Sequence, residues 1–270
     1  MEGPLCIIVY GLNELASAVA RKLRLAGHAV AVHEASPPNV LRRKKAFSDA
    51  WYDGAAALDG VEVRRADSNA EFIGGLRSGA FIPLWTHPLL DVVGRWPWDV
   101  VIDARADVEP AERRIFGSAE LTIALGPGAV AGVDCDLVIE TAGPDPGAVI
   151  RSGTARAPAS GSASPNDCIR SPSSGVFRSR RVIGEIIAAG ELLGAVEGRP
   201  VVVRRPGRVC GLQRSPRSVR IGDAIAELTP REQDRVSGVD RTNQLIARSV
   251  AFTIDIELKW PAMRFEALKW

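Results

Sequence analysis

The chain has 270 residues, a net charge of +2 and 46% hydrophobic residues, close to the averages of soluble globular proteins. That length can form one large domain or two modest ones. The basic residues form no long run, which argues against a general nucleic-acid binder, and no apolar stretch approaches the ~18 residues of a membrane span.

The cysteines and histidines predict neither a metal centre nor a disulfide framework. The four cysteines are far apart and include no C-x-x-C pair, and only three histidines are present. Reduced thiols in a cytoplasmic protein are the expected state. Because the N-terminus has no basic-then-apolar signal pattern, we expect a cytoplasmic protein. From the scattered basic residues and the absence of a long apolar stretch, we expect neither a nucleic-acid nor a membrane partner.

The N-terminal region predicts a strand, a glycine turn, a helix and a second strand. The apolar run Leu5–Val9 precedes Gly11, a helical pattern covers Leu15–Ala26, and Ala29–Val32 is again apolar. This order is typical of the first βαβ unit of a dinucleotide-binding fold.

Glu34 lies 23 residues after Gly11, close to the ~20-residue offset at which such folds place a carboxylate on the ribose hydroxyls. The other glycines of the fingerprint are absent, and Asn13 and Glu14 stand where a pyrophosphate would need bare backbone. Two interpretations follow: a nucleotide site, or the same packing without a tightly held dinucleotide.

Residues 36–54 show a weak helical stripe after two prolines. Arg42 and Arg43 in this stretch are candidates for a phosphate fork, a pair of side chains that binds the phosphate of the ligand that Glu34 would contact. Guanidinium groups suit this role because they present paired planar donors. The alternative is a solvated helix face.

A buried strand is predicted at Val100–Ile102, with Asp103 and Arg105 at its end. An Asp and an Arg two residues apart can point to the same side, one accepting from hydroxyls and one donating to phosphate, or they can form only a surface ion pair. Weaker signals before this strand predict a strand, a helix and a strand at Val61–Val63, Ala70–Leu76 and Phe81–Leu84.

The sequence LTIALGPGAVAGVDCDLVIET at residues 121–141 predicts a buried strand, a tight glycine turn and another strand. Gly126 and Gly128 can take positive φ, so the turn could expose backbone N–H groups to an anionic ligand. The alternative is an ordinary turn whose glycines are only steric. We expect this loop to share one rim of the sheet with the ends of the other parallel strands.

The predicted site is a cofactor-binding site without assigned catalytic residues or metal ligands. It comprises Gly11, Asn13, Glu34, Arg42, Arg43, Asp103, Arg105, Gly126, Gly128, Gly132, Asp134 and Glu140.

The C-terminal part predicts a different kind of domain. Residues 168–239 contain two similar stretches, 171–196 and 205–228, each with a Pro and Gly turn followed by an Ile-Gly-acid turn. Such a duplication is similar to that of lipoyl and biotinyl carrier domains. Those carriers attach their cofactor to a lysine in the hairpin joining the halves, but residues 196–200 hold none. We therefore expect a scaffold or docking surface without covalent lipoyl or biotin.

The predicted fold class is α/β, with four segments. A Rossmann-like parallel-sheet domain covers residues 1–150, a linker or exposed loop 151–167, a small β domain of lipoyl or barrel-sandwich type 168–239, and a C-terminal helix packed on the core, with a tail, 240–270.

Several stretches together resemble the accessory proteins of selenium-dependent molybdenum hydroxylases, distant relatives of xanthine dehydrogenase accessory proteins. They are IIVYGLNELASAVARKLRLAGHAV, PPNVLRRKKAFSDAWYDG, VVIDARAD, LTIALGPGAVAGVDCDLVIET, RSPSSGVF and RVCGL. The chain departs from that family's GGGD at residues 11–14 and from its Asn-Arg-Gly-His run at residues 142–145. It is therefore identified as a diverged member.

The resemblance implies a maturation role: binding a phosphorylated compound, either a molybdopterin-type cofactor or a nucleotide, and docking to a client enzyme. Turnover is not implied, and the client, the ligand and homo-oligomerisation stay open. Two alternatives remain. One is an NAD(P)-dependent oxidoreductase, which would need an acid or base near the nicotinamide. The other is a non-catalytic structural partner with a vestigial pocket.

Overall fold

The computed structural model describes residues 3–88, 96–105, 113–157 and 166–259, which fold into two compact units. The α/β unit comprises residues 1–38, 47–159 and 239–270, and the β unit comprises residues 39–46 and 160–238. Each unit is thus assembled from separate pieces of sequence. Residues 158–165 of the predicted linker and 260–270 of the predicted tail lie outside the described residues.

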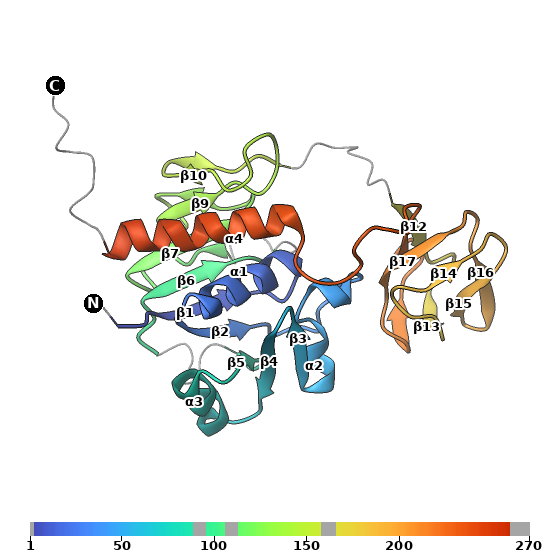
Figure 1. Ribbon diagram of the computed structural model, residues 1–270, viewed down its shortest axis with the longest axis horizontal. Helices are drawn as coiled ribbons and strands as arrows, with labels where there is room; N and C mark the ends of the chain where they lie inside the picture. Colours follow the sequence, from blue (N-terminus) through green and yellow to red (C-terminus); the bar gives the residue numbers. More distant parts are fainter. Residues whose placement is uncertain (1–2, 89–95, 106–112, 158–165, 260–270) are drawn as a thin grey trace. The chain divides into compact units, whose positions relative to one another are not determined.

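The α/β unit contains a nine-stranded sheet of order β10-β9-β7-β6-β1-β2-β5-β4-β3 (Figure 1). All neighbouring pairs are parallel except β3 with β4 and β10 with β9. A separate two-stranded sheet joins β8 (Val130–Ala131) and β11 (Gly153–Thr154). The strands of the large sheet are β1 (Cys6–Tyr10), β2 (Ala29–His33), β3 (Ala55–Leu58), β4 (Val61–Ala66), β5 (Ile82–Trp85), β6 (Val100–Asp103), β7 (Leu121–Leu125), β9 (Leu137–Ile139) and β10 (Val149–Ile150).

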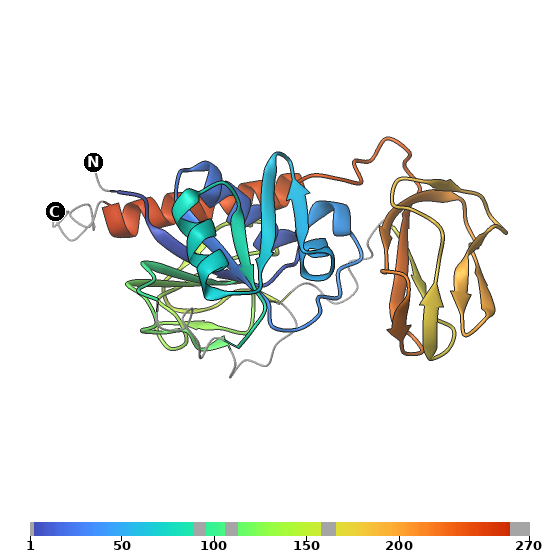
Figure 2. The same cartoon turned by 90° about the horizontal axis from the view of Figure 1, so that it is seen from below.

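Both faces of the large sheet are covered, which is why its central strands are apolar on both sides. Helices α1 (Glu14–Leu25) and α4 (Arg241–Ile254) lie side by side over one face, joined to strand residues such as Ile7 in one core (Figures 1 and 2). Helix α3 (Asn69–Ser78) packs on the other face, joined to Ile8. A π-helix, η4 (Asp255–Lys259), follows α4. No helix in the described part of the chain is long and apolar enough to cross a membrane.

The prediction of one helical stripe across residues 36–54 is wrong. Residues 39–46 belong to the β unit and contain only the 3-10 turn η1 (Arg43–Lys45), while the helix α2 (Asp49–Asp53) belongs to the α/β unit. The apolar residue Leu41 is not on a helix face. Its carbonyl accepts from Leu212 N–H of the β unit at 2.9 Å.

The β unit consists of two four-stranded antiparallel sheets, β12-β19-β17-β14 and β16-β15-β13-β18. The unit has two halves, β12 to β15 and β16 to β19. When each strand is replaced by its counterpart four places along in the other half (β12 by β16, β19 by β15, and so on), the order of one sheet becomes the order of the other. The halves are therefore related by a quasi-two-fold symmetry. The strands are β12 (Asp167–Arg170), β13 (Gly175–Arg178), β14 (Ile186–Ile187), β15 (Leu192–Val196), β16 (Arg199–Val202), β17 (Gly207–Leu212), β18 (Arg217–Val219) and β19 (Ala224–Thr229).

The repeat has a period of 32 residues, since β12 begins at Asp167 and its counterpart β16 at Arg199. Hydrogen bonds obey the same exchange: Gly190 N–H donates to Val203 O at 2.8 Å, and Gly222 N–H donates to Ser171 O at 2.9 Å. Gly222 is therefore the counterpart of Gly190. This corrects the sequence alignment, which paired the Ile-Gly-Asp turn at 221–223 with the Ile-Gly-Glu turn at 183–185.

Two adjacent glycines in α3 test how tightly this helix packs. Gly75→Ala would place a Cβ 2.7 Å from Phe81 Cε2 and 3.1 Å from Pro83 Cβ, whereas at Gly74 the space is open. Gly74→Ala should raise the free energy of unfolding by about 0.5–1 kcal/mol through helix propensity. Gly75→Ala should lower it by about 1–2 kcal/mol through overpacking.

Urea denaturation followed by tryptophan fluorescence measures both effects, because all six tryptophans belong to the α/β unit. Equal effects of the two substitutions would contradict the close packing of α3 on β5.

Candidate functional site

The strand order of the large sheet reverses at β1. The chain places β2 on one side of β1 and β6 on the other, and all three are parallel, so their carboxyl ends meet at one edge. Open α/β sheets bind ligands in the crevice outside such a point. The last residues of these strands are Tyr10, His33 and Asp103.

Gly11 and Asn13 form the turn between β1 and α1. Gly11 has φ +110°, and a Cβ there would lie 3.4 Å from backbone atoms of Ala104 and Arg105, so glycine permits the close approach. Asn13 caps α1, accepting from Ala16 N–H at 2.9 Å, and its Nδ2 donates to Ala104 O at 2.6 Å. The turn after β1 is thereby tied to the turn after β6.

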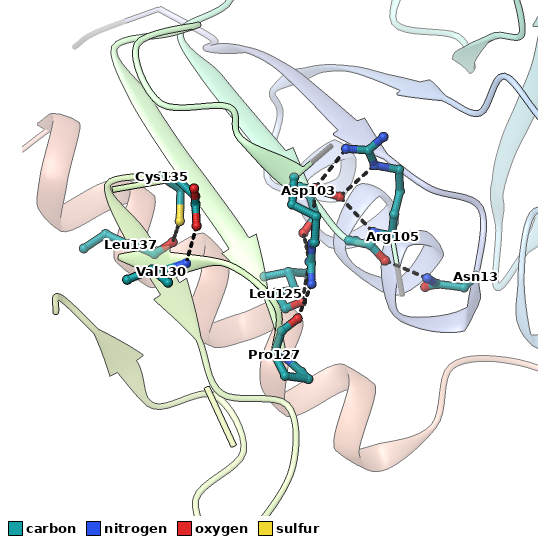
Figure 3. Close-up of polar contacts among 11 residues, drawn as sticks. Asn13, Asp103, Arg105, Leu125, Pro127, Val130, Cys135 and Leu137 are labelled. Carbon is teal, nitrogen blue, oxygen red and sulfur yellow. Dashed lines mark hydrogen bonds and ion pairs between the residues drawn. The ribbon is translucent and has the colours of Figure 1, made fainter. Parts of the chain in front are cut away.

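Asp103 is a fully buried carboxylate that contacts two arginines, Arg105 and Arg113. Figure 3 shows its contact with Arg105. Arg105 donates to both of its oxygens, Nε to Oδ1 and Nη2 to Oδ2, each at 3.0 Å. Arg113 Nε reaches Oδ2 at 3.4 Å, and its other nitrogens donate to the carbonyls of Leu125, at 2.9 Å, and Pro127. This cluster joins the end of β6 to the loop after β7.

Glu34 is half-buried immediately after β2. Burial raises the pKa of its carboxyl, while the amides of Ser36 and Leu12 and the positive charge of Arg105 act in the opposite direction. The side chain is thus near both the turn after β1 and the cation of the Asp103 cluster. A carboxylate in this place can accept hydrogen bonds from ligand hydroxyl or amine groups.

Two aromatic side chains line the same edge. The rings of Tyr10 and His33 meet edge to face with centroids 5.6 Å apart, and the Arg105 guanidinium carbon lies 5.5 Å from the Tyr10 ring centroid. Burial raises the pKa of Tyr10 to about 12. Burial also lowers the pKa of His33, so His33 favours the neutral form more than a solvated histidine.

The glycine loop after β7 differs from the prediction that its amides face a ligand. Gly126 N–H donates to Ile139 O at 2.9 Å, and Gly132 N–H donates to Cys135 O at 2.8 Å. The carbonyl oxygens of Leu125, at the end of β7, and of Pro127, in the loop, accept hydrogen bonds from Arg113. A Cβ on Gly128 would lie 3.3 Å from Arg113 Nη1, so this glycine makes room for the guanidinium.

Asp134 and Glu140 have structural roles. Asp134 accepts from Val130 N–H at 2.9 Å, closing the turn that contains β8. Burial alone would raise the pKa of Glu140, but amides including those of Arg156 and Ala142 donate to its carboxylate and lower the pKa overall. Both carboxylates are therefore occupied within the protein.

The predicted site residues Arg42 and Arg43 belong to the β unit and have hydrogen-bond partners within it. Arg42 Nε is 2.6 Å from Glu227 Oε2 on β19, and Arg43 Nε donates to Leu212 O on β17 at 3.0 Å. These contacts anchor residues 39–46 to the rest of the β unit, and the phosphate fork beside Glu34 stays a prediction.

The structure therefore unites five of the predicted residues directly at the edge: Gly11, Asn13, Glu34, Asp103 and Arg105. Sequence reasoning missed Arg113, Tyr10 and His33. Arg113 follows no periodic pattern, so no local signal marked it. Tyr10 and His33 could have been found from their positions, because each is the last residue of an apolar strand.

Chemically, the edge offers a hydrogen-bond acceptor at Glu34, a cation at Arg105 and an aromatic wall at Tyr10 and His33. Within the described residues, no three His, Cys, Asp or Glu side chains gather as metal ligands would. The arrangement suits recognition of a ligand with hydroxyl or amine donors and a nearby negative charge.

The two arginines of the Asp103 cluster differ in burial, which gives a matched pair of substitutions. The Arg113 side chain is 3% exposed and that of Arg105 22%. Arg113→Met should cost about 3–5 kcal/mol of unfolding free energy, because it removes a buried partner of a buried charge. Arg105→Met should cost less, about 1–3 kcal/mol, because its own side chain is partly exposed although Asp103 is not. Urea denaturation checks this, and equal losses would refute the larger structural role given to Arg113, which also holds the carbonyls of Leu125 and Pro127.

The raised pKa of Glu34 has a definite effect on stability. A protonated Glu34 favours the folded state, so its contribution is fully present below the ordinary glutamate pKa and is lost as pH rises through the raised pKa. Glu34→Gln should therefore match the wild type near pH ~4 and become the more stable protein by pH ~7.

Denaturation at several pH values measures this difference. Glu62→Gln is the control, because a hydrogen bond from Arg64 lowers the pKa of Glu62 and its substitution should not stabilise at neutral pH. A constant difference between wild type and Glu34→Gln across this range would contradict the assignment.

One relative is similar to most of the chain. The "Uncharacterized protein YqeB" of Escherichia coli (strain K12) is 32% identical over 248 residues, covering 85% of this chain and 43% of the relative. The chain thus spans less than half of that relative's length. No family model matches the chain, and no solved structure matches it.

Proposed function

We propose that the chain is an accessory protein that holds a phosphorylated nucleotide or molybdopterin-type compound at the edge between β1 and β6, and docks to a client enzyme of the molybdenum-hydroxylase type. The observation that carries the proposal is the meeting of the Gly11 turn, Glu34 and Arg105 where the strand order reverses. The sequence resemblance supplies the class of client.

The topology supports a Rossmann-like description of the α/β unit. The β1-α1-β2 unit lies at the centre, and β6 and β7 extend the parallel sheet beyond β1. The half of the sheet beyond β2 departs from the Rossmann order, because β5 lies between β2 and β4 and the antiparallel β3-β4 hairpin forms the edge. A ligand site at the strand-order reversal is compatible with this modification.

The groups at the edge favour particular ligand contacts. Glu34 would accept from the hydroxyls of a ribose or the amine and ring N–H of a pterin, and Arg105 would face a phosphate. The α1 N-terminus favours no pyrophosphate, because Asn13 already takes the Ala16 amide and Glu14 adds a negative charge to the first turn. A ligand held by its base and sugar, with phosphate at the margin, fits best.

The β unit supports the docking part of the proposal. Its quasi-two-fold sheets are similar to the interlocked halves of lipoyl and biotinyl carriers. The hairpin between its halves carries Glu197 and Gly198, both at positive φ, and Glu197 folds back to accept from Val176 N–H at 2.7 Å. A hairpin that has no lysine and whose Glu197 side chain is bound to the neighbouring strand β13 suits a scaffold better than a carrier of a covalently attached cofactor.

One alternative has specific support. Arg105 is paired with Asp103, and the amides of Gly126 and Gly132 donate to protein carbonyls, so several groups that could bind a ligand already have partners. These contacts favour a structural partner with a vestigial pocket as the second candidate function.

Native mass spectrometry of the full chain purified from its own source separates the two. A retained phosphorylated compound is expected in the wild type and in Arg64→Gln, a control on the exposed part of β4. The compound should be lost in Arg105→Gln and reduced in Glu34→Gln. Absence of any compound, with AMP, GTP and NADH all binding more weakly than ~1 mM, would favour the vestigial pocket. NADH binding followed by turnover would favour an oxidoreductase.

A further inference from the structure

The two units carry opposite charges, although the whole chain is nearly neutral. Residues 39–46 and 160–238 hold 17 Lys and Arg against 8 Asp and Glu, a net charge of +9. The α/β unit holds 17 against 24, a net charge of −7. The β unit is therefore a basic module, and charge asymmetry of this kind points to an anionic partner.

The β unit also has an open side. Strand β12 pairs only with β19, and β16 pairs only with β15, among the strands that the structure describes. Each is therefore an edge strand with backbone N–H and C=O groups not used in its own sheet. The two strands are counterparts in the 32-residue repeat, so the opening lies where the two halves face each other.

A cavity of about 440 Å³ lies between these edge strands. Its apolar lining comes from both halves, including Ile169 and Val201, and its charged groups are Asp167, Arg170 and Arg204. Arg170 Nη1 donates to Gly222 O at 2.9 Å, while Arg204 is exposed. Cys168, Pro172, Pro200 and Val202 complete the wall.

We propose that this cavity binds an extended, acidic and apolar segment of a partner protein, which adds as a strand to the edge of β12. β12 is the better edge because each of its four residues has a backbone N–H, whereas β16 contains Pro200. Apolar side chains of the segment enter between the sheets, and its carboxylates face Arg170 and Arg204. Asp167 at the other end of β12 sets the direction, because it repels an acidic residue there.

The composition of the β unit favours a protein over a nucleic acid. Thirteen arginines and no lysine occur in residues 160–238, and their planar guanidinium groups suit paired contacts with carboxylates as well as with phosphates, so the aromatic side chains decide between the two partners. The same residues contain one aromatic side chain, Phe177, which is fully buried. The cavity therefore has no aromatic surface on which bases could stack.

This inference rests on the docking part of the proposed function and names the chemistry that the docking partner presents. It does not depend on what binds near Glu34. Charge reversal at the cavity should leave retention of a small molecule at the α/β edge unchanged, so failure of one proposal can be told from failure of the other.

The experiment is panning of a random 12-residue peptide library, displayed on phage, against the full chain, followed by titration with the enriched peptide. Arg170→Glu with Arg204→Glu should weaken binding by about tenfold or more. Arg178→Glu with Arg235→Glu is the matched control, because both arginines are exposed, lie outside the cavity lining and give the same change in net charge.

The expected result is enrichment of peptides alternating Asp or Glu with apolar residues, protection of the β12 amides from hydrogen exchange, and unchanged binding by the control. Thermal unfolding verifies that the two double variants stay folded. Enrichment of basic peptides, equal losses in both double variants, or displacement by a single-stranded 12-nucleotide DNA would each overturn the proposal.

Discussion

The buried carboxylate of Asp103 is the constraint on which the candidate site depends. A carboxylate with no exposure needs full compensation, and here it takes it from two arginines that come from different positions in the chain. Because Arg113 also holds the carbonyls of the loop after β7, one charge fixes both the end of β6 and the neighbouring loop. The orientation of Arg105 toward Tyr10 and Glu34 follows from the same contact.

That arrangement explains how a glycine-poor turn can still belong to a built site. Only Gly11 is needed for the backbone of one turn to approach another, and Asn13 replaces the bare amides of the usual fingerprint by capping the helix. The site therefore has side-chain groups where a dinucleotide fold has backbone donors. The proposed function therefore relies on hydroxyl, amine and aromatic contacts rather than on a pyrophosphate.

The second organising feature is the discontinuity of both units. The chain enters the β unit briefly at residues 39–46 and again at 160–238, and then returns to the α/β unit to form α4. Arg42 and Arg43 are anchored in the β unit by Glu227 and the Leu212 carbonyl, which also brings four basic residues into that unit. This assembly strengthens the segregation of charge, whereas the cavity between β12 and β16 owes its basic groups to Arg170 and Arg204.

The sequence by itself determined the elements whose signals are local. The apolar runs form β1, β2, β6, β7 and β9, and the helical periods form α1 and α4. Gly11, Glu34, Asp103 and Arg105 come at or just after the ends of β1, β2 and β6. They lie near one another because neighbouring parallel strands place their carboxyl ends at the same edge of the sheet. Only the tertiary structure decided the fate of Arg42 and Arg43, the role of Arg113, the direction of the glycine-loop amides and the register of the repeat. Those outcomes depend on which distant groups satisfy a buried charge or a backbone hydrogen bond, and such pairings leave no periodic trace in the sequence.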